Sequence, residues 1–430
     1  MQFAIYNVVK AMAFLDVGIL IVKCLVLALA TTTLFAYFTL FERIVLARLQ
    51  NRVGPNRAGY IPLPGGRKLL GGFLQPAADA VKLFFKEDIT PAMADKWVYL
   101  ISPAFATIPA LIIWATIPLG CWPVGGNGVL PVGGCAPAGG SNFLQLAEIS
   151  IGILYLLAVT SLGVYGIAIA GWSSNNKYSM LGGVRASAQI ISYELALGLS
   201  VLAVVMQAES FSTAQIVDKQ WGWWYIVPQF LGFVIFLLAS TAEVVRAPFD
   251  LVEAEQELVG GYNTEFGSMK FALFFMSEYI KLVAMNAIAV TLFLGGWHFP
   301  GLYTLREGLA PTIGDAGANA VFGLLSLGAF LLKVAVLSFV SVWVRATIPR
   351  VRYDQLMNLG WKILLPMALF NVALTAVLNV LIGDRYISGI IAFVIGLVVV
   401  LGVASFSGPR KPSSEVTMVK KQATQANVQS

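Results

Sequence analysis

The stretch Thr241–Glu265, TAEVVRAPFDLVEAEQELVGGYNTE, decides how the chain is interpreted, because it places many acids between two long apolar segments. Against a single arginine, Arg246, its acidic residues are Glu243, Asp250, Glu253, Glu255, Glu257 and Glu265. Closely packed carboxyl groups hold protons more tightly than isolated ones, since one ionised group disfavours ionisation of the next. Apolar residues are interleaved with the acids, which favours a partly buried segment. A solvated acidic loop that docks onto a basic partner is the alternative.

Composition places the whole chain in a membrane. Of its 430 residues 58% are hydrophobic and only 12% are charged, whereas a soluble domain is roughly a quarter charged. The net charge of +6 is better explained by membrane topology than by binding of nucleic acid. Three cysteines and one histidine, without a CxxC motif, argue against a metal or iron–sulfur site on this chain. We therefore expect no catalytic redox centre here, and any electron carriers should lie on other chains.

Apolar segments predict an all-α, polytopic membrane bundle of about nine transmembrane helices, since a span needs roughly 17 to 25 residues. The predicted spans are Val17–Phe41, Val98–Leu119, Leu146–Ala170, Ile191–Gln207, Tyr225–Ala242, Phe271–Leu294, Ala320–Val344, Ile363–Ile382 and Tyr386–Ala404. The last two should form a tight hairpin. We expect one membrane domain over residues 1–407, with an acidic segment at 241–270, and a polar tail at 408–430 that is disordered.

The distribution of basic residues predicts the orientation. Most of the 28 lysines and arginines fall in the loops after the first, third, fifth and seventh spans and in the C-terminal tail. By the positive-inside rule, the N-terminus is outside and the C-terminus is cytoplasmic. The acidic segment then lies on the cytoplasmic side. On the opposite side, Cys121 and Cys135 face an oxidising compartment if the membrane is a bacterial envelope, so a disulfide is an open possibility.

The first cytoplasmic loop, Glu42–Trp97, contains a predicted amphipathic helix within GFLQPAADAVKLFFKED (Gly72–Asp88). A simple peripheral anchor is the alternative interpretation. The arginines that follow the first span have two possible uses, namely binding lipid headgroups or bordering an opening for a lipid-soluble substrate. These arginines are Arg43, Arg48, Arg52 and Arg57.

Three acids, Glu194, Glu243 and Glu278, lie within or at the ends of predicted spans. An ionisable group at such depth costs a few kcal/mol, so it normally faces protein or water. We predict a row of carboxyl groups that runs from the cytoplasmic face into the bundle. Its countercharges would be Arg185, Arg246 and Lys281. A purely structural ion-pair cluster is the alternative. Lys333, in the seventh span, is a further candidate as a relay group or a counter-ion.

Several ordered blocks of the chain resemble one known family, the H subunits of bacterial NADH:quinone oxidoreductase (respiratory complex I). The blocks are ERIVLARLQNRVGPNRAG (Glu42–Gly59), LQPAADAVKLFFKE (Leu74–Glu87), GWSSNNKYSMLGGVRASAQIISYE (Gly171–Glu194), AEVVRAPFDLVEAEQELVGGYNTEF (Ala242–Phe266) and PRVRYDQLMNLGWKILLP (Pro349–Pro366). Related subunits of membrane-bound hydrogenases share the architecture but match these blocks less fully. The outer loop around Cys121–Cys135 is longer than the usual family form.

The resemblance implies a subunit at the junction of the soluble redox arm and the membrane arm. Quinone would be its substrate, and flavin and iron–sulfur clusters would sit on partner subunits. The mouth of the quinone tunnel would involve Glu42, Arg43, Arg52 and Asp79. The acidic channel for proton coupling would include Glu194, Glu243, Asp250, Glu253, Glu255, Glu257 and Glu278, with Arg246 as countercharge and Glu265 as a further family acid.

Quinone binding coupled to proton pumping is therefore the leading hypothesis, with membrane lipid, soluble quinone-site subunits and membrane-arm subunits as partners. The expected location is the bacterial inner (plasma) membrane, as a multi-pass protein. A stand-alone ion-coupled transporter, a hydrogenase subunit and a passive anchor for the soluble arm are the rival interpretations.

Overall fold

The computed structural model is an all-α bundle, as the apolar segments predict. Within the described part of the chain, eight helices are long and apolar enough to cross a membrane. The structure describes residues 2–56, 58, 61–62, 68–69, 72–124, 135, 141–142, 144–250, 261–382 and 385–406. The predicted disordered tail and the acids Glu253, Glu255 and Glu257 therefore lie outside the described residues.

Most helices correspond to the predicted spans. The helices are α1 (Gln2–Leu49), α2 (Gln75–Phe85), α3 (Lys96–Ile112), α4 (Gly152–Ser173), α5 (Lys177–Ala208), α6 (Thr213–Asp218), α7 (Phe230–Glu243), α8 (Ser268–Phe293), α9 (Leu302–Thr347), α10 (Tyr353–Asn358), α11 (Leu365–Ile382) and α12 (Arg385–Phe406). A 3₁₀ turn, Ile113–Ala115, extends α3, and a π-helix, Leu359–Leu364, joins α10 to α11. The helix α9 is interrupted at Gly314, whose φ is 79°.

Two pairs of short strands complete the described structure. Strands β1 (Ile61–Pro62) and β2 (Lys68–Leu69) are antiparallel, as are β3 (Pro123–Val124) and β4 (Ser141–Asn142). Each strand has two residues, so the sheets only close local loops.

Two helix boundaries differ from the prediction in a way that matters for the site. The helix α1 continues to Leu49, so Glu42 lies on a helix and not at the start of a loop. The helix α5 begins at Lys177, where the Asn176 side chain accepts a hydrogen bond from the N–H of Tyr178 at 3.0 Å. Glu194 is consequently near the middle of α5 and not in the first turn of this helix. The polar residues before Ile191 are helical because Asn176 caps the start of α5 and small residues allow its first half to pack closely.

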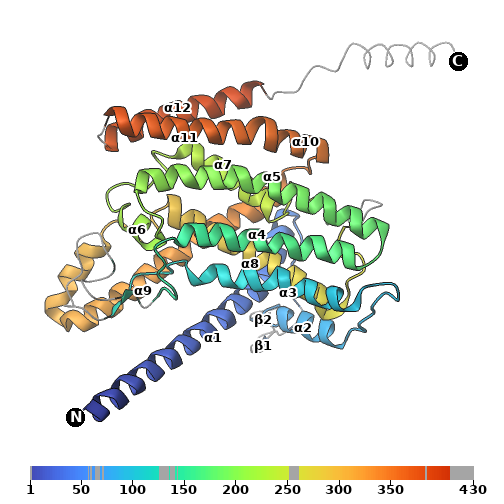
Figure 1. The fold of residues 1–430 in the computed structure, drawn as a ribbon, viewed down its shortest axis with the longest axis horizontal. Coiled ribbons are helices and arrows are strands. Elements are labelled where there is room, and N and C mark those ends of the chain that lie inside the picture. The colour runs from blue at the N-terminus through green and yellow to red at the C-terminus, as the bar shows by residue number, and fades with distance from the viewer. Residues whose placement is uncertain are drawn as a thin grey trace.

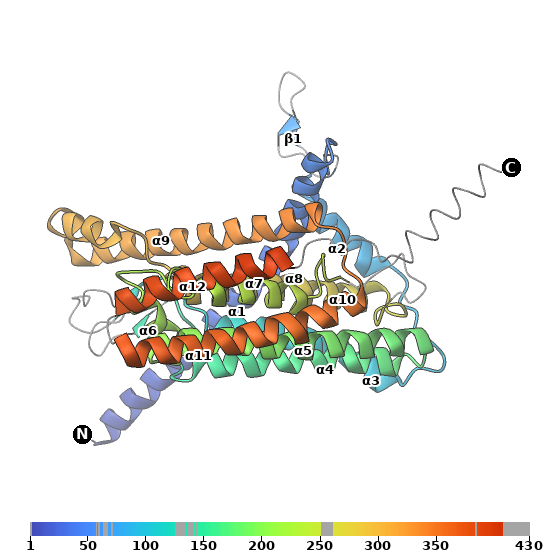
Figure 2. The ribbon, with the colours of Figure 1, turned by 90° about the horizontal axis from the view of Figure 1, so that it is seen from above.

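The long helices run side by side, with α9 at one flank of the bundle and α3 and α4 at the other (Figures 1 and 2). The helices α11 and α12 pack against each other, which confirms the predicted hairpin. The helix α1 crosses the bundle obliquely, and its first half extends away from the other helices. The end of the bundle that contains α6 and the N-terminal half of α1 is called the disulfide end below.

The helix α8 forms the centre of the bundle. Within its most apolar stretch of 18 residues 78% are buried, which is more than in any other candidate span described. The helices α1, α3, α7 and α9 surround it. Large side chains such as Phe236, Phe293 and Phe330 are fully buried in the same hydrophobic core. This placement puts any polar side chain of α8 deep inside the protein.

Glycines allow α4, α5 and the segment before α8 to touch backbone to backbone. A Cβ added at Gly182 would lie 2.7 Å from the carbonyl carbon of Gly261, and one added at Gly171 would lie 2.8 Å from the Ser179 oxygen. Only a residue without a side chain fits these positions. The contact holds Tyr262 beside α5, where Ser179 donates a hydrogen bond to its carbonyl at 2.9 Å.

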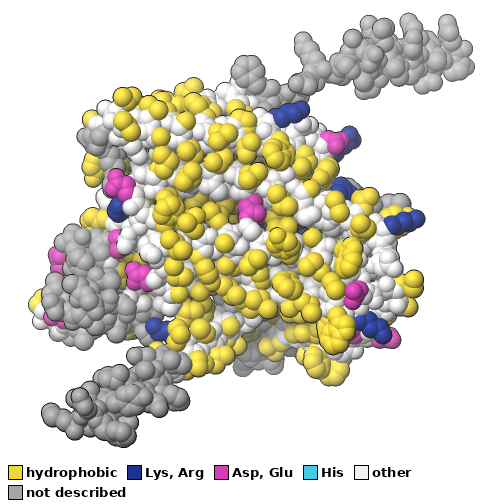
Figure 3. All heavy atoms as spheres, in the orientation of Figure 1, with side chains coloured by type: hydrophobic (Ala, Val, Ile, Leu, Met, Phe, Trp, Pro, Cys, Tyr) yellow, Lys and Arg dark blue, Asp and Glu magenta, His cyan; other side chains and the backbone are white. Residues whose placement is uncertain are grey.

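The outer face over α4, α5 and α11 is mainly hydrophobic, with charged side chains gathered toward the two ends of the bundle (Figure 3). Exposed side chains on α4 and α5 include Leu154, Leu162, Leu195 and Leu202. Such a band is typical of a surface that contacts lipid or another membrane helix.

Candidate functional site

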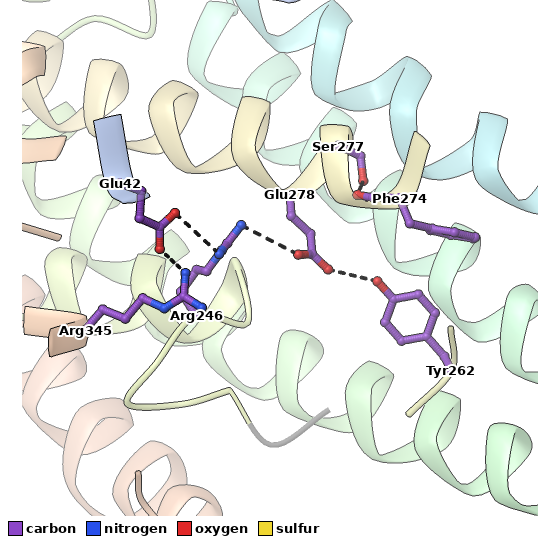
Figure 4. Close-up of polar contacts among 7 residues, drawn as sticks. All are labelled: Glu42, Arg246, Tyr262, Phe274, Ser277, Glu278 and Arg345. Atoms are coloured by element: carbon purple, nitrogen blue, oxygen red, sulfur yellow. Dashed lines mark hydrogen bonds and ion pairs between the residues drawn. The ribbon is translucent and has the colours of Figure 1, made fainter. Parts of the chain in front are cut away.

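A buried network of charges joins four elements of the bundle at the end opposite the disulfide. Glu42 comes from α1, Arg246 from the turn after α7, Glu278 from α8 and Arg345 from the last turn of α9 (Figure 4). Glu42, Arg246 and Glu278 are only 4%, 6% and 7% exposed. Buried charges are costly unless they are paired, so these side chains must compensate one another.

Arg246 stands between the two glutamates. Its Nη1 lies 3.9 Å from Oε2 of Glu42, and its Nη2 lies 3.9 Å from Oε2 of Glu278. Arg345 donates a hydrogen bond to the other carboxylate oxygen of Glu42. Tyr262 donates its hydroxyl to Oε1 of Glu278 at 2.9 Å. The network therefore runs from the α1 surface to the centre of the bundle through alternating positive and negative groups (Figure 4).

Aromatic rings support the arginine. The guanidinium carbon of Arg246 lies 3.8 Å from the centroid of the Tyr279 ring and 5.7 Å from that of Phe275. A ring face attracts a cation, and the attraction is stronger where water is excluded. The pocket beside Glu42, Arg246 and Tyr279 has room for about 20 Å³, which is roughly one water molecule. The pocket is too small for a quinone ring.

The backbone that presents Arg246 is held from α5. Gln189 donates hydrogen bonds from its amide to the carbonyls of Ala242 and Phe249, at 2.9 and 3.0 Å. Val245, just before Arg246, has a φ of 57°, which is unfavourable for a β-branched residue. The α5 amide and the close packing thus maintain a strained turn that directs the guanidinium into the bundle.

A second ion pair joins α7 to α8. Its members, Glu243 and Lys281, are each three residues along the chain from Arg246 and Glu278, respectively. The Nζ of Lys281 lies 2.8 Å from Oε1 of Glu243, whose side chain is 1% exposed. Glu194 on α5 is within electrostatic reach of both groups and accepts a hydrogen bond from Ser161 of α4. The predicted acids Glu194, Glu243 and Glu278 are thus brought to neighbouring positions.

Glu194 also borders an open groove between α4 and α5. The groove has a volume of about 440 Å³ and is otherwise lined by apolar side chains such as Leu157, Leu195 and Val205. Figure 3 shows an acidic side chain within an otherwise hydrophobic face over these helices.

Two further predicted acids lie at the edge of this region. Asp250 pairs with Arg350, whose Nη2 is 3.2 Å from Oδ2. Glu265 accepts a hydrogen bond from the amide of Asn176 at 2.6 Å. Both contacts tie the acidic segment to neighbouring loops and leave these acids outside the Glu42–Arg246–Glu278 network.

The four residues predicted at the tunnel mouth are separated in the structure. Arg43 on α1 forms a pair with Asp79 on α2 at 2.6 Å, and Gln75 donates to the same carboxylate at 3.1 Å. Arg52 is exposed just beyond the end of α1. Glu42, by contrast, faces inward and joins the acids assigned to proton coupling.

Two further basic residues, Arg185 and Lys333, contact an aromatic ring and backbone carbonyls among the described residues. The guanidinium of Arg185 lies over the Tyr353 ring at 5.1 Å. Lys333 donates hydrogen bonds to the carbonyls of Leu294, Gly296 and His298 at 2.7 to 2.9 Å. An ammonium group has three protons, so Lys333 is fully used in capping the C-terminal end of α8. This arrangement favours a structural cation over a relay group.

Sequence reasoning misses several residues of the network. In the sequence, Arg345 counts only as one of the basic residues that predict the orientation, although it follows an apolar span and precedes a block that resembles the family. Tyr262 and Tyr279 flank predicted acids but carry no charge to attract notice. Ser161 lies within a predicted span, and only the fold brings it to Glu194. Within the described residues no group of three His, Cys, Asp or Glu side chains is placed to hold a metal ion.

Comparison with known proteins places this arrangement in a family. The profile of the NADH dehydrogenase family matches residues 22–376. An H subunit of NADH-quinone oxidoreductase from Geobacter metallireducens, the second of that name, is 45% identical over 360 residues, covering 84% of this chain and 95% of that protein. The H subunit from Protochlamydia amoebophila is 45% identical, covering 80% and 92%. The H subunit from Deinococcus deserti is 47% identical, covering 83% of each chain.

Proposed function

The chain belongs to the NADH dehydrogenase family, and on that premise we propose that it binds quinone and couples quinone reduction to proton translocation. It is a subunit of an NADH:quinone oxidoreductase and a multi-pass protein of the bacterial inner membrane, where its partners are the other subunits of the complex. In the proposal, quinone enters from the bilayer beside α1 and α2, and flavin and iron–sulfur clusters on partner subunits supply the electrons.

One observation carries the proposal. Arg246 lies 3.9 Å from both Glu42 and Glu278, so a change of charge near one glutamate alters the field at the other. At an effective dielectric constant of about 20, unit charges about 4 Å apart interact by roughly 4 kcal/mol. Moving one charge against 100 mV costs about 2.3 kcal/mol. Rearranging one such pair is therefore large enough to influence the movement of one proton.

The proposed sequence of events follows the contacts. Charge or protons drawn to a quinone near α1 weaken the attraction between Glu42 and Arg246. Arg246 then moves closer to Glu278 and stabilises its ionised form, while Tyr262 maintains the orientation of that carboxylate. The pair formed by Lys281 and Glu243 lies one turn away and transmits the change toward Glu194. Glu253, Glu255 and Glu257 lie outside the described residues and remain predicted members of this path.

The quinone ring itself is proposed to bind where a soluble partner subunit completes the site. The pocket of about 20 Å³ beside Glu42 supports this division, because it accommodates water and no ring. Arg43, Asp79 and Arg52 then border the approach from the bilayer.

Replacement of Glu278 by Gln tests the coupling role. We expect the complex to assemble, and proton pumping per NADH oxidised to fall, because the substituted amide cannot carry the charge. Pumping is measured as quenching of a pH-sensitive dye in inverted membrane vesicles, with oxidation rate recorded in parallel. Exposed Glu87, replaced by Gln, is the matched control. Unchanged pumping in Glu278→Gln would favour a passive anchor.

Photolabelling tests the tunnel. A photoreactive quinone analogue added to the intact complex should label residues 42–86 of this chain, and an excess of natural quinone should compete. Labelling confined to partner subunits would contradict the tunnel role. Reconstitution of the purified chain alone distinguishes this proposal from the transporter hypothesis. We expect no proton-coupled transport without the redox partners, and transport by the chain alone would favour a transporter.

A further inference from the structure

A further cavity lies at the end of the bundle opposite the disulfide that Cys121 and Cys135 form. Its volume is about 480 Å³, which is within the range of ligand sites. It opens on the flank of α3 and α4, where α3 begins, α4 ends and α5 begins (Figure 2). Its walls are the loop before α3, the turn 174–177 between α4 and α5, and Glu265 from the segment before α8. This cavity is called the turn pocket below.

Hydrogen bonds between the three walls fix the shape of the turn pocket. The N–H of Asp95 donates to the carbonyl of Ser173 at 3.1 Å, which ties the loop before α3 to the end of α4. The Tyr99 hydroxyl of α3 donates to the backbone carbonyl of Glu265 at 2.7 Å. Asn176 donates its side-chain amide to Oε1 of the same glutamate at 2.6 Å. The pocket is therefore formed by the fold itself and needs no ligand to assemble it.

The turn pocket presents one carboxylate and one ammonium group. Asn176 uses Oε1 of Glu265, and within the described part of the chain Oε2 has no hydrogen-bond partner. Lys177 is exposed, and its Nζ lies over the Tyr178 ring at 5.3 Å. Asn175, also exposed, adds an amide that can both donate and accept. Opposite charges in one open pocket suit a zwitterionic ligand, because each charge of the ligand meets a group of the opposite sign.

The turn pocket lies at the level of the lipid headgroups. Trp97, in the first turn of α3, and Trp172, in the last turn of α4, are both exposed. Exposed tryptophans at the ends of spanning helices mark the boundary between membrane and water. Lys177, Leu181 and Val184 lie on one face of α5, since they are four and three residues apart. Leu181 and Val184 are exposed, so an apolar track leads from the pocket toward the bilayer centre.

We propose that the turn pocket binds the headgroup of a zwitterionic phospholipid with a primary ammonium group, such as phosphatidylethanolamine. The ammonium donates to Oε2 of Glu265, and the phosphate lies against Lys177 and accepts a hydrogen bond from Asn175. One acyl chain follows Leu181 and Val184 along α5. The tryptophans and the apolar track favour a lipid over a loop of a soluble partner subunit, which needs neither. Binding of this lipid does not depend on quinone or on the proposed coupling path.

The headgroup chemistry predicts an order of preference among phospholipids. Hydrogen bonds between charged groups are roughly twice as strong as neutral ones, so a headgroup that supplies both charges gains at both ends of the pocket. A choline headgroup has the same two charges, but its trimethylated nitrogen has no N–H to donate to Glu265. A glycerol headgroup has no cation, so its phosphate meets Lys177 while Glu265 stays unpaired. The ethanolamine lipid should therefore bind best.

Photolabelling of the intact complex in nanodiscs of phosphatidylglycerol tests the proposal without relying on activity. Three phospholipids with the same photoreactive acyl chain, and with ethanolamine, choline or glycerol headgroups, are compared at equal amounts. The ethanolamine lipid should label residues 181–188 several-fold more than the other two. Equal labelling by the three lipids would overturn the proposal, because it shows only general contact with the bilayer. Absence of labelling there would also overturn it and would favour a protein occupant.

Two substitutions test the two charges separately. Glu265→Gln retains an acceptor for Asn176 but loses the charge, so the preference for the ethanolamine lipid should disappear. Lys177→Gln, at an exposed residue, should lower labelling by the ethanolamine and choline lipids alike, because both contain the phosphate. Asp354→Asn, at an exposed acid of the same end, is the matched control and should keep the preference.

Either variant can refute the site. A Glu265→Gln complex that keeps the preference would refute the contact between Glu265 and the ammonium. If Glu265→Gln fails to assemble, Lys177→Gln still decides, since its side chain packs against no buried group and its loss should leave the fold intact. Unchanged labelling in Lys177→Gln would overturn the proposal.

Discussion

At the scale of single residues, Glu42 depends on two arginines that are far apart in sequence. Arg246 and Arg345 both face its carboxylate, and water is nearly excluded. The negative charge is stable there only while these partners remain. Single substitutions at the arginines should therefore have large effects, although neither residue touches a redox group.

Replacement of Arg345 by Gln should lower NADH:quinone reductase activity in membranes by about tenfold, equivalent to about 1.4 kcal/mol. Activity falls because Glu42 loses one of its two countercharges. The effect is moderate because the Arg345 side chain is 33% exposed and water can partly replace it. Arg345→Lys should recover part of the activity. The exposed Lys362, replaced by Gln, serves as control, and equal activities for the two Gln variants would refute the role of Arg345.

Tyr262→Phe tests a single hydrogen bond to Glu278. Removing a buried donor costs about 1–3 kcal/mol, and here it affects a carboxylate. Tyr99→Phe is the matched control, since the Tyr99 hydroxyl donates to the backbone carbonyl of Glu265 at 2.7 Å. We expect the pH profile of proton pumping to shift in Tyr262→Phe and to stay in place in Tyr99→Phe. The same shift in both variants would show a general effect of the missing hydroxyl.

At the scale of elements, α5 shows how packing overrides a local signal. Its first half contains polar residues and glycines, which predict a loop before the span. The structure makes this half helical because Asn176 caps it and Gly182 lies against Gly261. Glu194 moves from the end of a span to the middle of a helix as a result.

Gly182→Ala and Gly198→Ala form a matched pair on this helix. A Cβ at Gly182 meets the backbone of Gly261 at 2.7 Å, whereas one at Gly198 meets nothing within 4 Å. We expect Gly182→Ala to destabilise the protein by about 1–3 kcal/mol and to reduce the amount of assembled complex. Gly198→Ala should be neutral or stabilising by up to about 1 kcal/mol. Native gel electrophoresis and thermal inactivation measure both, and similar yields would contradict the close contact.

The Lys333→Met variant distinguishes a structural role of Lys333 from a role as a proton relay. Loss of three hydrogen bonds at the end of α8 should lower assembly, at about 1 kcal/mol or more per carbonyl left unsatisfied. Complexes that do assemble should pump as many protons per NADH as the parent. Normal assembly with impaired pumping would support the relay role instead.

At the scale of the whole molecule, the positive-inside rule makes a prediction that the fold itself does not test. The disulfide end should face outward and the Glu42 network should lie near the cytoplasm. A cysteine introduced at exposed Glu209, beside α6 at the disulfide end, should be labelled by a membrane-impermeant maleimide in spheroplasts. The parent chain, which retains the free Cys24, gives the background labelling. In inverted vesicles the introduced cysteine should remain protected, and the opposite pattern would reverse the orientation.

The sequence predicted the helical bundle well, because about 20 apolar residues in a row allow few structures other than a membrane helix. It also predicted Glu278 of the network, because charge in an apolar segment needs a partner, whereas Glu42 was predicted only at the tunnel mouth. The partners Arg345 and Tyr262 were not predictable, since they come from distant elements. Glu42 faces inward while Arg43 pairs with Asp79 at the surface. Which side of α1 each residue occupies depends on how far the helix continues beyond its apolar part, and composition does not determine this.

The late start of α7 has a consequence for how the chain can cross a bilayer at this point. Its 14 residues extend about 21 Å, some 9 Å less than the hydrocarbon layer of a bilayer. The helix begins at Phe230 instead of Tyr225 and ends at Glu243, so the missing length lies on its N-terminal side. A non-helical backbone is tolerated at membrane depth only where protein surrounds it and supplies its hydrogen bonds. Here the N–H of Ile226 donates to the carbonyl of Phe293 at 2.8 Å, and the N–H of Tyr225 donates to the Gln220 side chain at 3.2 Å. The neighbouring elements thereby let an irregular segment complete a crossing that the helix alone is too short to make.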